Sequence, residues 1–270
     1  MSLFFSIAKE DPSLERITMA HGAGGTIMHD LIKKYIVTHL GGSGAEVPLE
    51  ALDDAAVIGD IVLKSDSHAV KPIFFPGGDI GRLAVAGTVN DIAVMGAEPV
   101  ALSCGFVLEE GLKITDFERI LESMKQTCKE AGVYVITGDT KVVEKGNLGG
   151  CVINTSGIGK RTEALERNIA EVKKHRSFNA RWVLDSNLRE GDKIIVSGTV
   201  GDHGLAVLSA QEGYNFGTQI KSDVTPLNKL ITRLLNVGGI VAMKDPTRGG
   251  LSNALNEWSE KSKVGILVQE

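Results

Sequence analysis

Apolar residues repeat at helical spacing in three stretches of the first half of this chain. Residues 27–40 place them on one helical face, at Ile27, Leu31, Tyr35, Ile36 and Leu40. Residues 80–95 are rich in small side chains and stop at Gly96, which favours a helix that packs closely against its neighbours. Residues 115–131 open with the Thr-x-x-Glu pattern of a capping box and stop before Gly132. The pattern predicts three helices.

Between these helices, apolar and β-branched runs bounded by turn residues predict strands. The runs lie at residues 55–70, 71–75, 100–108, 133–143 and 149–159. Because strands and helices alternate, the predicted fold class is α/β with mixed sheets. We expect a two-domain protein whose first domain spans residues 1–160.

A charge-rich segment, residues 161–186, separates this half from the rest of the chain. Its apolar residues fall at helical spacing, at Leu165, Ile169 and Val172. We interpret the segment as a solvated helical linker, with a basic arm that docks a protein partner as the alternative. It marks the boundary between the two predicted domains.

The last part of the chain, residues 187–270, returns to an alternating pattern. Predicted strands lie at 192–198, 240–245 and 264–268, and predicted helices at 205–213, 225–238 and 251–262. These helices need a wider sheet than three strands supply. We therefore expect that this second domain is truncated and that a natural carboxyl-terminal part is missing.

Charge and cysteine content narrow the class of protein. The 270 residues carry a formal net charge of -5, with a pI of about 5.8, so no electrostatic reason favours nucleic acid or a membrane surface as partner. No apolar run is long enough for an export signal or a membrane span. Widely spaced cysteines suggest neither a disulfide framework nor a zinc site. We expect a cytoplasmic protein with three buried thiols, those of Cys104, Cys128 and Cys151.

Glycine-rich loops carry most of the candidate chemistry. The 32 glycines are roughly 12% of the chain, against an average near 7%. They gather in HGAGGT, PGGDIG, SGTVGDHG and DPTRGG, each with a His, Asp or Arg. Carboxylates recur at the ends of loops and strands, at Asp53, Asp54, Asp66, Asp79, Asp91 and Asp139. Oxygen ligands on flexible loops suit Mg²⁺, and glycine amides and helix starts hold phosphate oxygens. The set predicts a nucleotide-phosphate site, although a turn or N-cap role fits each aspartate alone.

Two observations limit this assignment. The chain has neither a P-loop motif nor a dinucleotide-binding glycine motif after a strand. Asp79 and Asp91 lie on one predicted helix, roughly 18 Å apart at 1.5 Å per residue, so they cannot hold one ion directly. Either they serve different ions, or a second subunit completes the site.

Seven motifs resemble, in the same order, those of the HypE family of hydrogenase-maturation proteins, in the aminoimidazole-ribonucleotide-synthetase-like superfamily. They are HGAGG, LDDAAVI, GGDIGRLAVAGTVNDIAVMGAEPVALSCGFVLEEG, ITGDTKVV, NTSGIG, GDHG and DPTRGGL. The resemblance runs from about His21 to the end of the chain. It implies a homodimer in which the first domain binds ATP and dimerises. Two features depart from the family: the 161–186 segment is longer than its usual linker, and its tail ending in Pro-Arg-Ile-Cys is absent.

The resemblance also implies an ATP-dependent carbamoyl dehydratase. Proteins of this family accept a carbamoyl group on the tail cysteine from the carbamoyltransferase HypF and use ATP to dehydrate the thiocarboxamide to a thiocyanate. The cyanide then passes to the iron of [NiFe]-hydrogenase, with the HypC-HypD assembly complex as a further partner. Phosphorylation of the amide oxygen turns a poor leaving group into phosphate. Because the tail cysteine is absent, we expect this chain not to carry the cyanide precursor itself.

The family's motifs imply site roles for residues of this sequence. ATP is expected to contact His21, Gly24, Gly25, Asp53, Asp54, Asp66, Asn90 and Thr140. Mg²⁺ is expected to be held by Asp53, Asp79 and Asp91. The catalytic candidates are Asp79, Asp139, Lys141 and Glu257, with Lys141 as a counter-charge or a base and Glu257 in proton transfer. His203 and Arg248 are expected to steady the tail or the domain interface.

Two rival functions stay open on the sequence alone. Another enzyme of the superfamily, such as selenophosphate synthetase or thiamine-phosphate kinase, would share the ATP site and act on a small molecule. Selenophosphate synthetase would need a reactive cysteine near the amino terminus, and none precedes Cys104. The second rival is a non-catalytic nucleotide-binding scaffold that docks maturation partners through residues 161–186.

Overall fold

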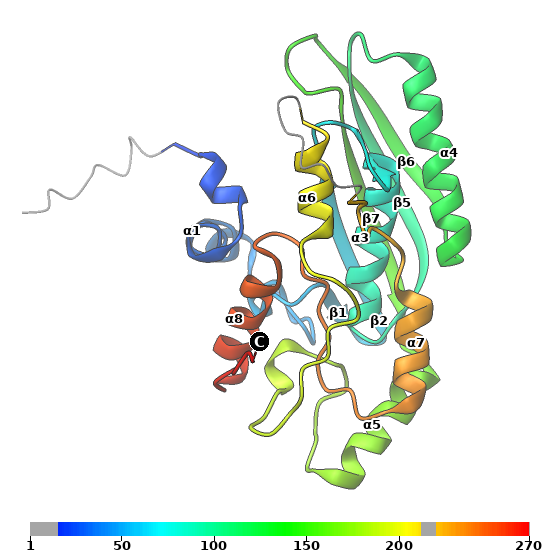
Figure 1. The fold of residues 1–270 in the computed structure, drawn as a ribbon. Helices are drawn as coiled ribbons and strands as arrows, with labels where there is room; N and C mark the ends of the chain where they lie inside the picture. Colours follow the sequence, from blue (N-terminus) through cyan, green and yellow to red (C-terminus); the bar gives the residue numbers. More distant parts are fainter. Residues whose placement is uncertain (1–15, 212–219, 270) are drawn as a thin grey trace, which may run out of the picture.

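A five-stranded mixed sheet is the larger of the two sheets of the described chain (Figure 1). The computed structural model describes residues 16–211 and 220–269. Neighbouring strands are antiparallel except for the last two, which run parallel. Across the sheet the order is β1 (Ala56–Ile58), β2 (Ile61–His68), β7 (Cys151–Lys160), β5 (Glu98–Glu109) and β6 (Tyr134–Val143). The predicted class, α/β with mixed sheets, is confirmed.

Helices α3 (Ile80–Val94) and α4 (Ile114–Ala131) cover one face of this sheet. The first turn of α3 is capped by Asp79, whose carboxylate accepts hydrogen bonds from the backbone N–H groups of Gly81 and Arg82. The helix approaches β7 closely because Gly157 has no side chain there: a Cβ atom at that position would lie 2.7 Å from the Cδ1 atom of Ile92. The predicted helices at 80–95 and 115–131 are confirmed.

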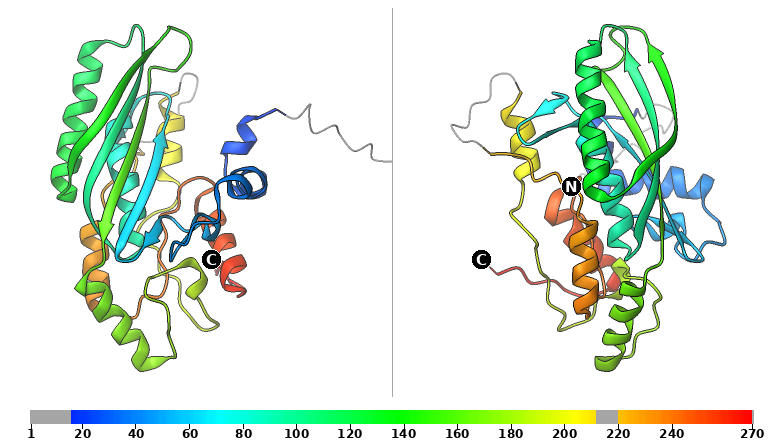
Figure 2. Two further views of the ribbon diagram at one scale, coloured as in Figure 1. Left: turned by 180° about the vertical axis from the view of Figure 1, so that it is seen from behind. Right: turned by 90° about the vertical axis from the view of Figure 1, so that its right-hand side faces the viewer.

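The opposite face of the sheet is open among the described residues (Figure 2). Along β2 the burial alternates, so Val62 and His68 point toward α3 while Ile61 and Leu63 point outward. Seen from behind, the strands lie in front of the helices. The outward positions on β1, β2 and β7 include exposed apolar residues, namely Ile58, Ile61, Leu63 and Ile158.

The amino-terminal part of the described chain is helical, as predicted for residues 27–40. It runs through α1 (Gly25–Leu31), the π-helical turn η3 (Ile32–Val37) and α2 (Thr38–Leu40). Short elements connect it to the sheet and to α3: η2 (Met19–Gly22), η4 (Leu49–Ala51), β3 (Phe74–Phe75) and β4 (Gly78–Asp79). This arrangement leaves the loop of residues 52–55 directly before β1.

The charged segment between the halves contributes one helix face to the core, so it is not a wholly solvated linker. Helix α5 (Glu163–His175) begins at Thr162, whose hydroxyl accepts a hydrogen bond from the N–H of Leu165. It packs against α7 (Asn228–Val237) in one hydrophobic cluster that includes its three predicted apolar residues, Leu165, Ile169 and Val172. The interpretation as a solvated helix is therefore wrong for this apolar face.

The second half contains helices but, within residues 187–211 and 220–269, no strand. Helices α6 (Asp202–Ser209), α7 and α8 (Gly250–Ser262) lie where helices were predicted; residues 212–213 of the first prediction fall outside the described chain. After η5 (Asp185–Asn187), the segments predicted as strands are irregular, so those predictions are wrong for this structure: 192–198, 240–245 and 264–268. A strand needs a hydrogen-bonded neighbour, which a local pattern does not provide.

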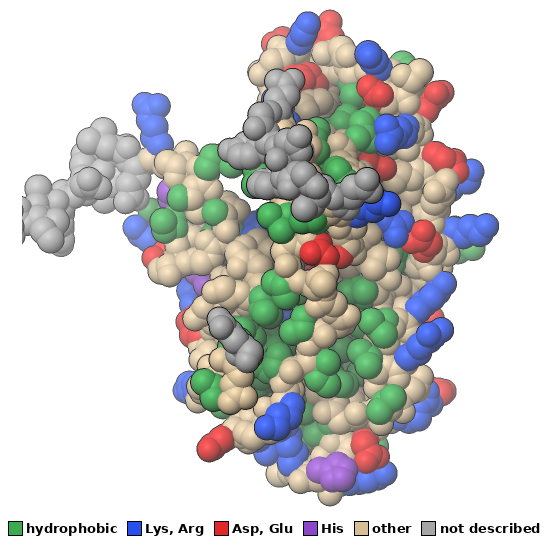
Figure 3. All heavy atoms as spheres, in the orientation of Figure 1, with side chains coloured by type: hydrophobic (Ala, Val, Ile, Leu, Met, Phe, Trp, Pro, Cys, Tyr) green, Lys and Arg blue, Asp and Glu red, His purple; other side chains and the backbone are tan. Residues whose placement is uncertain are grey.

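Apolar side chains of the second half reach the surface. Ile195 is 85% exposed and Leu267 is 82% exposed. Figure 3 shows hydrophobic side chains gathered on the lower half of the molecule, between α8 and α7. Among the described residues no helix is long and apolar enough to cross a membrane.

Candidate functional site

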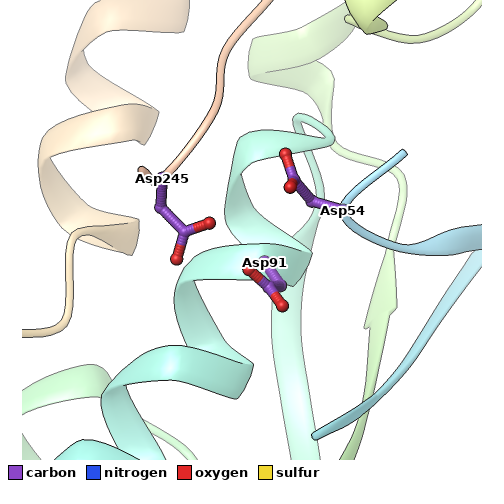
Figure 4. Close-up of side chains that lie close together, drawn as sticks. All are labelled: Asp54, Asp91 and Asp245. Carbon is purple, nitrogen blue, oxygen red and sulfur yellow. The ribbon is translucent and has the colours of Figure 1, made fainter. Parts of the chain in front are cut away.

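Three carboxylates meet where the two halves of the chain join (Figure 4). Asp54 lies in the loop before β1, Asp91 on the buried face of α3, and Asp245 in the loop before α8. One oxygen of each lies within 4.8 Å of the others. We call these three residues the acidic site.

Asp91 is buried, Asp54 and Asp245 are partly buried, and the three carboxylates lie close enough to affect one another's pKa values. Burial first, and then the neighbouring carboxylates, raise the pKa of Asp54 to about 7 and that of Asp245 well above its ordinary range. Two lysines compensate in part: Lys64 Nζ lies 2.5 Å from Asp91, and Lys244 Nζ lies 3.0 Å from Asp54.

A divalent cation fits this donor set. The three side chains offer hard carboxylate oxygens, the ligands that Mg²⁺ prefers. The raised pKa values reflect burial together with repulsion from other carboxylates, which are Asp185 and Asp91 for Asp54, and Asp91 and Asp54 for Asp245; a bound cation would relieve this repulsion. We therefore regard the acidic site as a candidate magnesium site.

A second polar group lines the β2 side of the acidic site. Burial first, and then the Asp91 carboxylate, raise the pKa of Asp66 to about 6, although the positive charges of Lys64 and Arg248 oppose this shift. Burial likewise lowers the pKa of His68 to about 4, so this imidazole is neutral near pH 7. Gly87 allows the His68 ring to pack closely against α3, because a Cβ atom at residue 87 would lie 3.0 Å from the Cε1 atom of His68.

Two glycine-rich loops are joined beside the acidic site. Gly24 has a φ of +86° and packs on the DPTRGG loop, where an added Cβ atom would lie 2.9 Å from the carbonyl carbon of Arg248. The N–H of Gly25 donates to Asn253 Oδ1 of α8 at 3.1 Å. His21 turns back on its own segment, where its Nδ1 accepts from the N–H of Thr18 at 3.1 Å. The loops bring the starts of α1 and α8 together, an arrangement suited to binding phosphate oxygens.

Glu257, on α8, lies next to the acidic site. Its Oε1 is 2.8 Å from His29 Nε2 and accepts from Asn253 Nδ2, and its Oε2 is 2.9 Å from Lys244 Nζ. Burial would raise its pKa, but the contacts with Lys244, His29 and Asn253 outweigh burial and hold the pKa below the ordinary value. The carboxylate is therefore ionised near neutral pH and is able to accept a proton.

Other predicted residues lie outside the acidic site. Asp79 caps the amino-terminal end of α3, whereas Asp91 lies near the carboxyl-terminal end of the same helix. Asp53 turns toward Asp185 and Lys261, with its Oδ1 3.2 Å from the N–H of Asp185 and 3.4 Å from Lys261 Nζ. The geometry thus favours Asp54 and Asp245 over Asp53 and Asp79 as partners of Asp91.

Asn90 has a packing role in this structure. Its amide donates to the carbonyl of Thr225 at 3.1 Å and its Oδ1 accepts from the N–H of Leu227 at 2.7 Å. These two bonds fasten the segment before α7 onto α3. Both polar ends of the side chain are therefore engaged within the protein.

The GDTK residues are not brought to the acidic site within one chain. Asp139, Thr140 and Lys141 lie on the exposed edge strand β6. Asp139 and Lys141 pair with Gly105 and Val107 of β5, which alternate with the buried Cys104, so they project from the open face of the sheet. Their catalytic and ATP-binding roles stay predictions.

Sequence reasoning missed Asp245 of the acidic site and the two lysines that contact the site, Lys64 and Lys244. Asp245 stands at the start of DPTRGG, one of the four glycine-rich clusters, so the pairing of Asp with a glycine-rich loop was an available signal. Lys244 lies in a segment predicted as a strand, and no local pattern marks it. Its partner Asp54 is 190 positions away in the chain.

Solved structures and curated relatives agree on the family. The chain superposes on a HypE-HypF complex with a TM-score of 0.76 at 44% identity, covering 86% of this chain and 70% of that one. Against HypE in complex with ATP the TM-score is 0.67 at 42% identity, with 90% and 68% covered.

Residues 52–160 match the N-terminal domain, and residues 189–270 the C-terminal domain, of AIR synthase related proteins. Fold and site thus define a two-domain protein of the AIR synthase-related class. Carbamoyl dehydratase HypE of Cupriavidus necator is 41% identical over 257 residues, which cover 94% of this chain and 69% of that protein. The chain belongs to the HypE family of hydrogenase-maturation proteins, and the resemblance seen in its motifs is confirmed.

Proposed function

We propose that this chain is an ATP-dependent carbamoyl dehydratase that converts a cysteine-bound thiocarboxamide into a thiocyanate for [NiFe]-hydrogenase maturation. The observation that carries the proposal is the acidic site beside two joined glycine-rich loops, in a chain of this family. The reaction moves the amide oxygen onto the γ-phosphate of ATP and removes two N–H protons. The products are thiocyanate, ADP and phosphate; one of the two protons leaves on the phosphate as HPO₄²⁻ and the other is released.

Asp54, Asp91 and Asp245 would hold the magnesium ion of Mg-ATP. The ion would supply charge neutralisation at the phosphates. The backbone N–H groups of the two glycine-rich loops would bind phosphate oxygens, as at other helix starts. A related HypE has been solved with ATP at 42% identity, which supports the same ligand here.

Glu257 is proposed as the proton acceptor. Its carboxylate is ionised and lies next to the acidic site through their common partner, Lys244. The side chain is 13% exposed, which limits competition from bulk water. A positioned carboxylate of this kind takes an amide proton as phosphate leaves.

The carrier thiol is proposed to be none of the three cysteines in residues 1–270. All three are buried, and burial raises the pKa of each thiol, to about 11 for Cys104. A buried, protonated thiol is a poor nucleophile. A partner of the HypF type would therefore carbamoylate another cysteine, which this site then processes, before transfer to an iron-assembly complex such as HypC-HypD. The solved HypE-HypF complex supports HypF as the partner.

The open face of the sheet is proposed to pair with a second copy of the chain. It exposes apolar residues at Ile58, Ile61, Leu63 and Ile158, and within the described parts of the chain β6 is an edge strand with one neighbour, β5. Asp139 and Lys141 project from the same face. Their proposed roles therefore belong to the assembled homodimer.

The test is magnesium-dependent ATP turnover with a cysteine-containing peptide that HypF has carbamoylated. Asp91→Asn removes a central carboxylate without changing side-chain volume, and we expect turnover to fall by at least 10²-fold because phosphate charge is no longer neutralised. Asp60→Asn is the matched control, because Asp60 is an exposed aspartate paired with Arg181. Thiocyanate formed by Asp91→Asn at the wild-type rate would reject the acidic site as the reaction centre. ATP binding without any turnover in the wild type would favour the scaffold.

A further inference from the structure

A buried lysine, Lys244, joins the acidic site to α8. Its ammonium has three N–H bonds and three carboxylate partners: Asp54 at 3.0 Å, Asp185 at 2.9 Å and Glu257 at 2.9 Å. The side chain is 9% exposed, so these contacts form away from bulk water. Because every hydrogen is used, the three acceptors fix the position of the ammonium. Lys244 thus lies between a proposed cation ligand and the proposed proton acceptor.

Of the three acceptors of Lys244, Asp185 is neither a proposed cation ligand, as Asp54 is, nor the proposed proton acceptor, Glu257. Asp185 is 2% exposed and sits in η5. Its Oδ2 accepts from Lys244 at 2.9 Å and from Lys261 at 2.7 Å, and its Oδ1 accepts from the indole N–H of Trp258 at 2.7 Å. Burial would raise the pKa of Asp185, but the two lysines outweigh burial, and the carboxylate is ionised. Both oxygens of Asp185 therefore accept hydrogen bonds, two at Oδ2 and one at Oδ1.

Lys261 extends this arrangement to the loop that carries Asp54. Its Nζ donates to the carbonyl of Leu52 at 2.6 Å and to Asp53 Oδ1 at 3.4 Å. Leu52 has a φ of +51°, a left-handed conformation that is uncommon for a residue with a side chain and needs support from its surroundings. Asp185 therefore supports, through two lysines, both the loop and the α8 carboxylate.

We propose that Asp185 is a positioning residue for the acidic site, which holds Asp54 toward a bound cation and Glu257 beside it. The inference rests on the proposed function of the acidic site as a cation site. Without the Asp185 charge, Lys244 keeps only Asp54 and Glu257 as ionic partners. The ammonium of Lys244 would then interact more strongly with Asp54 and compete with the cation, and Lys261 would lose the carboxylate that holds it beside the loop.

The experiment compares Asp185→Asn with Asp192→Asn. The control removes a carboxylate a few residues away that binds Arg176 at 2.8 and 2.9 Å, so it also breaks an ion pair but leaves Lys244 untouched. Mn²⁺ binding is measured by electron paramagnetic resonance. We expect Asp185→Asn to weaken Mn²⁺ binding by about tenfold, in line with other residues that orient metal ligands, and Asp192→Asn to leave it unchanged. In turnover assays, Asp185→Asn should raise the KM for Mg²⁺ and lower kcat.

A milder variant keeps the test informative if Asp185→Asn does not fold. Trp258→Phe removes one donor to Asp185 without changing charge and should weaken Mn²⁺ binding in the same direction by a smaller factor. Unchanged Mn²⁺ affinity in the folded variants, with only a lower melting temperature, would overturn the positioning role. So would a wild-type chain that binds no Mn²⁺. A wild type that binds Mn²⁺ but turns over no ATP would reject the proposed function alone, since the Mn²⁺ comparison still decides the role of Asp185.

Discussion

At the scale of single residues, protons and a divalent cation compete for the same oxygens. Asp54 has a pKa of about 7 in the fold, against an ordinary value of 3.8. Between these values the folded chain holds a proton that the unfolded chain releases. Protonation of Asp54 therefore stabilises the cation-free fold at low pH, and this contribution is lost as the pH rises through about 7. Cation binding has the opposite dependence, because it needs the ionised carboxylate.

We predict that Mg²⁺ raises the melting temperature more at about pH 8 than at about pH 6, where Asp54 is mostly protonated. Thermal unfolding with Mg²⁺ and with a chelator, at both pH values, measures this difference. The Asp91→Asn variant should show a small Mg²⁺ effect at either pH. An equal Mg²⁺ effect on the wild type at the two pH values would contradict the prediction.

The sequence indicated aspartates for a magnesium site, but only part of the set follows from local pattern. Asp91 was predicted and lies in the acidic site. Asp54, and not Asp53, points into the acidic site because of the left-handed conformation of Leu52 and the contact between Lys261 and Asp53. The LDDAAVI motif shows neither of these features. Asp79 took the N-cap role that also fits its position before a helix. Asp245 requires the tertiary fold, which brings distant segments together.

At the scale of elements, close contact between α3 and β7 sets the position of Asp91. Gly157→Ala would place a Cβ atom 2.7 Å from both Ile92 Cδ1 and Leu102 Cδ2, two side chains that are almost fully buried. We expect the free energy of unfolding to fall by about 1–3 kcal/mol, as for other overpacked cores. Urea denaturation measures it.

Gly204→Ala is the control for this substitution. Gly204 lies in α6, and no atom lies within 4 Å of an added Cβ atom there. This change should be neutral or stabilise by up to about 1 kcal/mol, because alanine favours helix more than glycine does. A similar loss of stability in both variants would mean that close packing at Gly157 is not the cause.

The helices were largely predictable because capping and periodicity are local. Asp79 and Thr162 cap their helices, and Gly132 ends α4 in a left-handed conformation. The three strands predicted for the second half were wrong, because a local pattern does not show whether a strand has a neighbour. Residues 192–198 have strand composition, but a strand is defined by its neighbour, and the described residues supply none there.

At the scale of the whole molecule, the open sheet face predicts self-association. Leu63 is 48% exposed on this face, on β2 beside the exposed Ile158 of β7. Leu63→Glu would bury an unpaired charge in a dimer and should shift the chain toward monomer. Light scattering coupled to size-exclusion chromatography measures the mass. Leu121→Glu, at a leucine 39% exposed on α4, is expected to leave the mass unchanged. A wild-type monomer, or an unchanged mass for Leu63→Glu, would contradict the homodimer.

The acidic site also has a consequence for the order of folding. Its carboxylates come from the start of the sheet, from α3 and from a loop near α8, and the ion pair between Lys244 and Asp54 spans 190 positions. Contacts of such long range close large loops and form late. The first domain can therefore complete its sheet before any cation site exists. Cation binding would then begin only when the second half has docked, so a newly made chain would gain affinity for the ion in its last folding step.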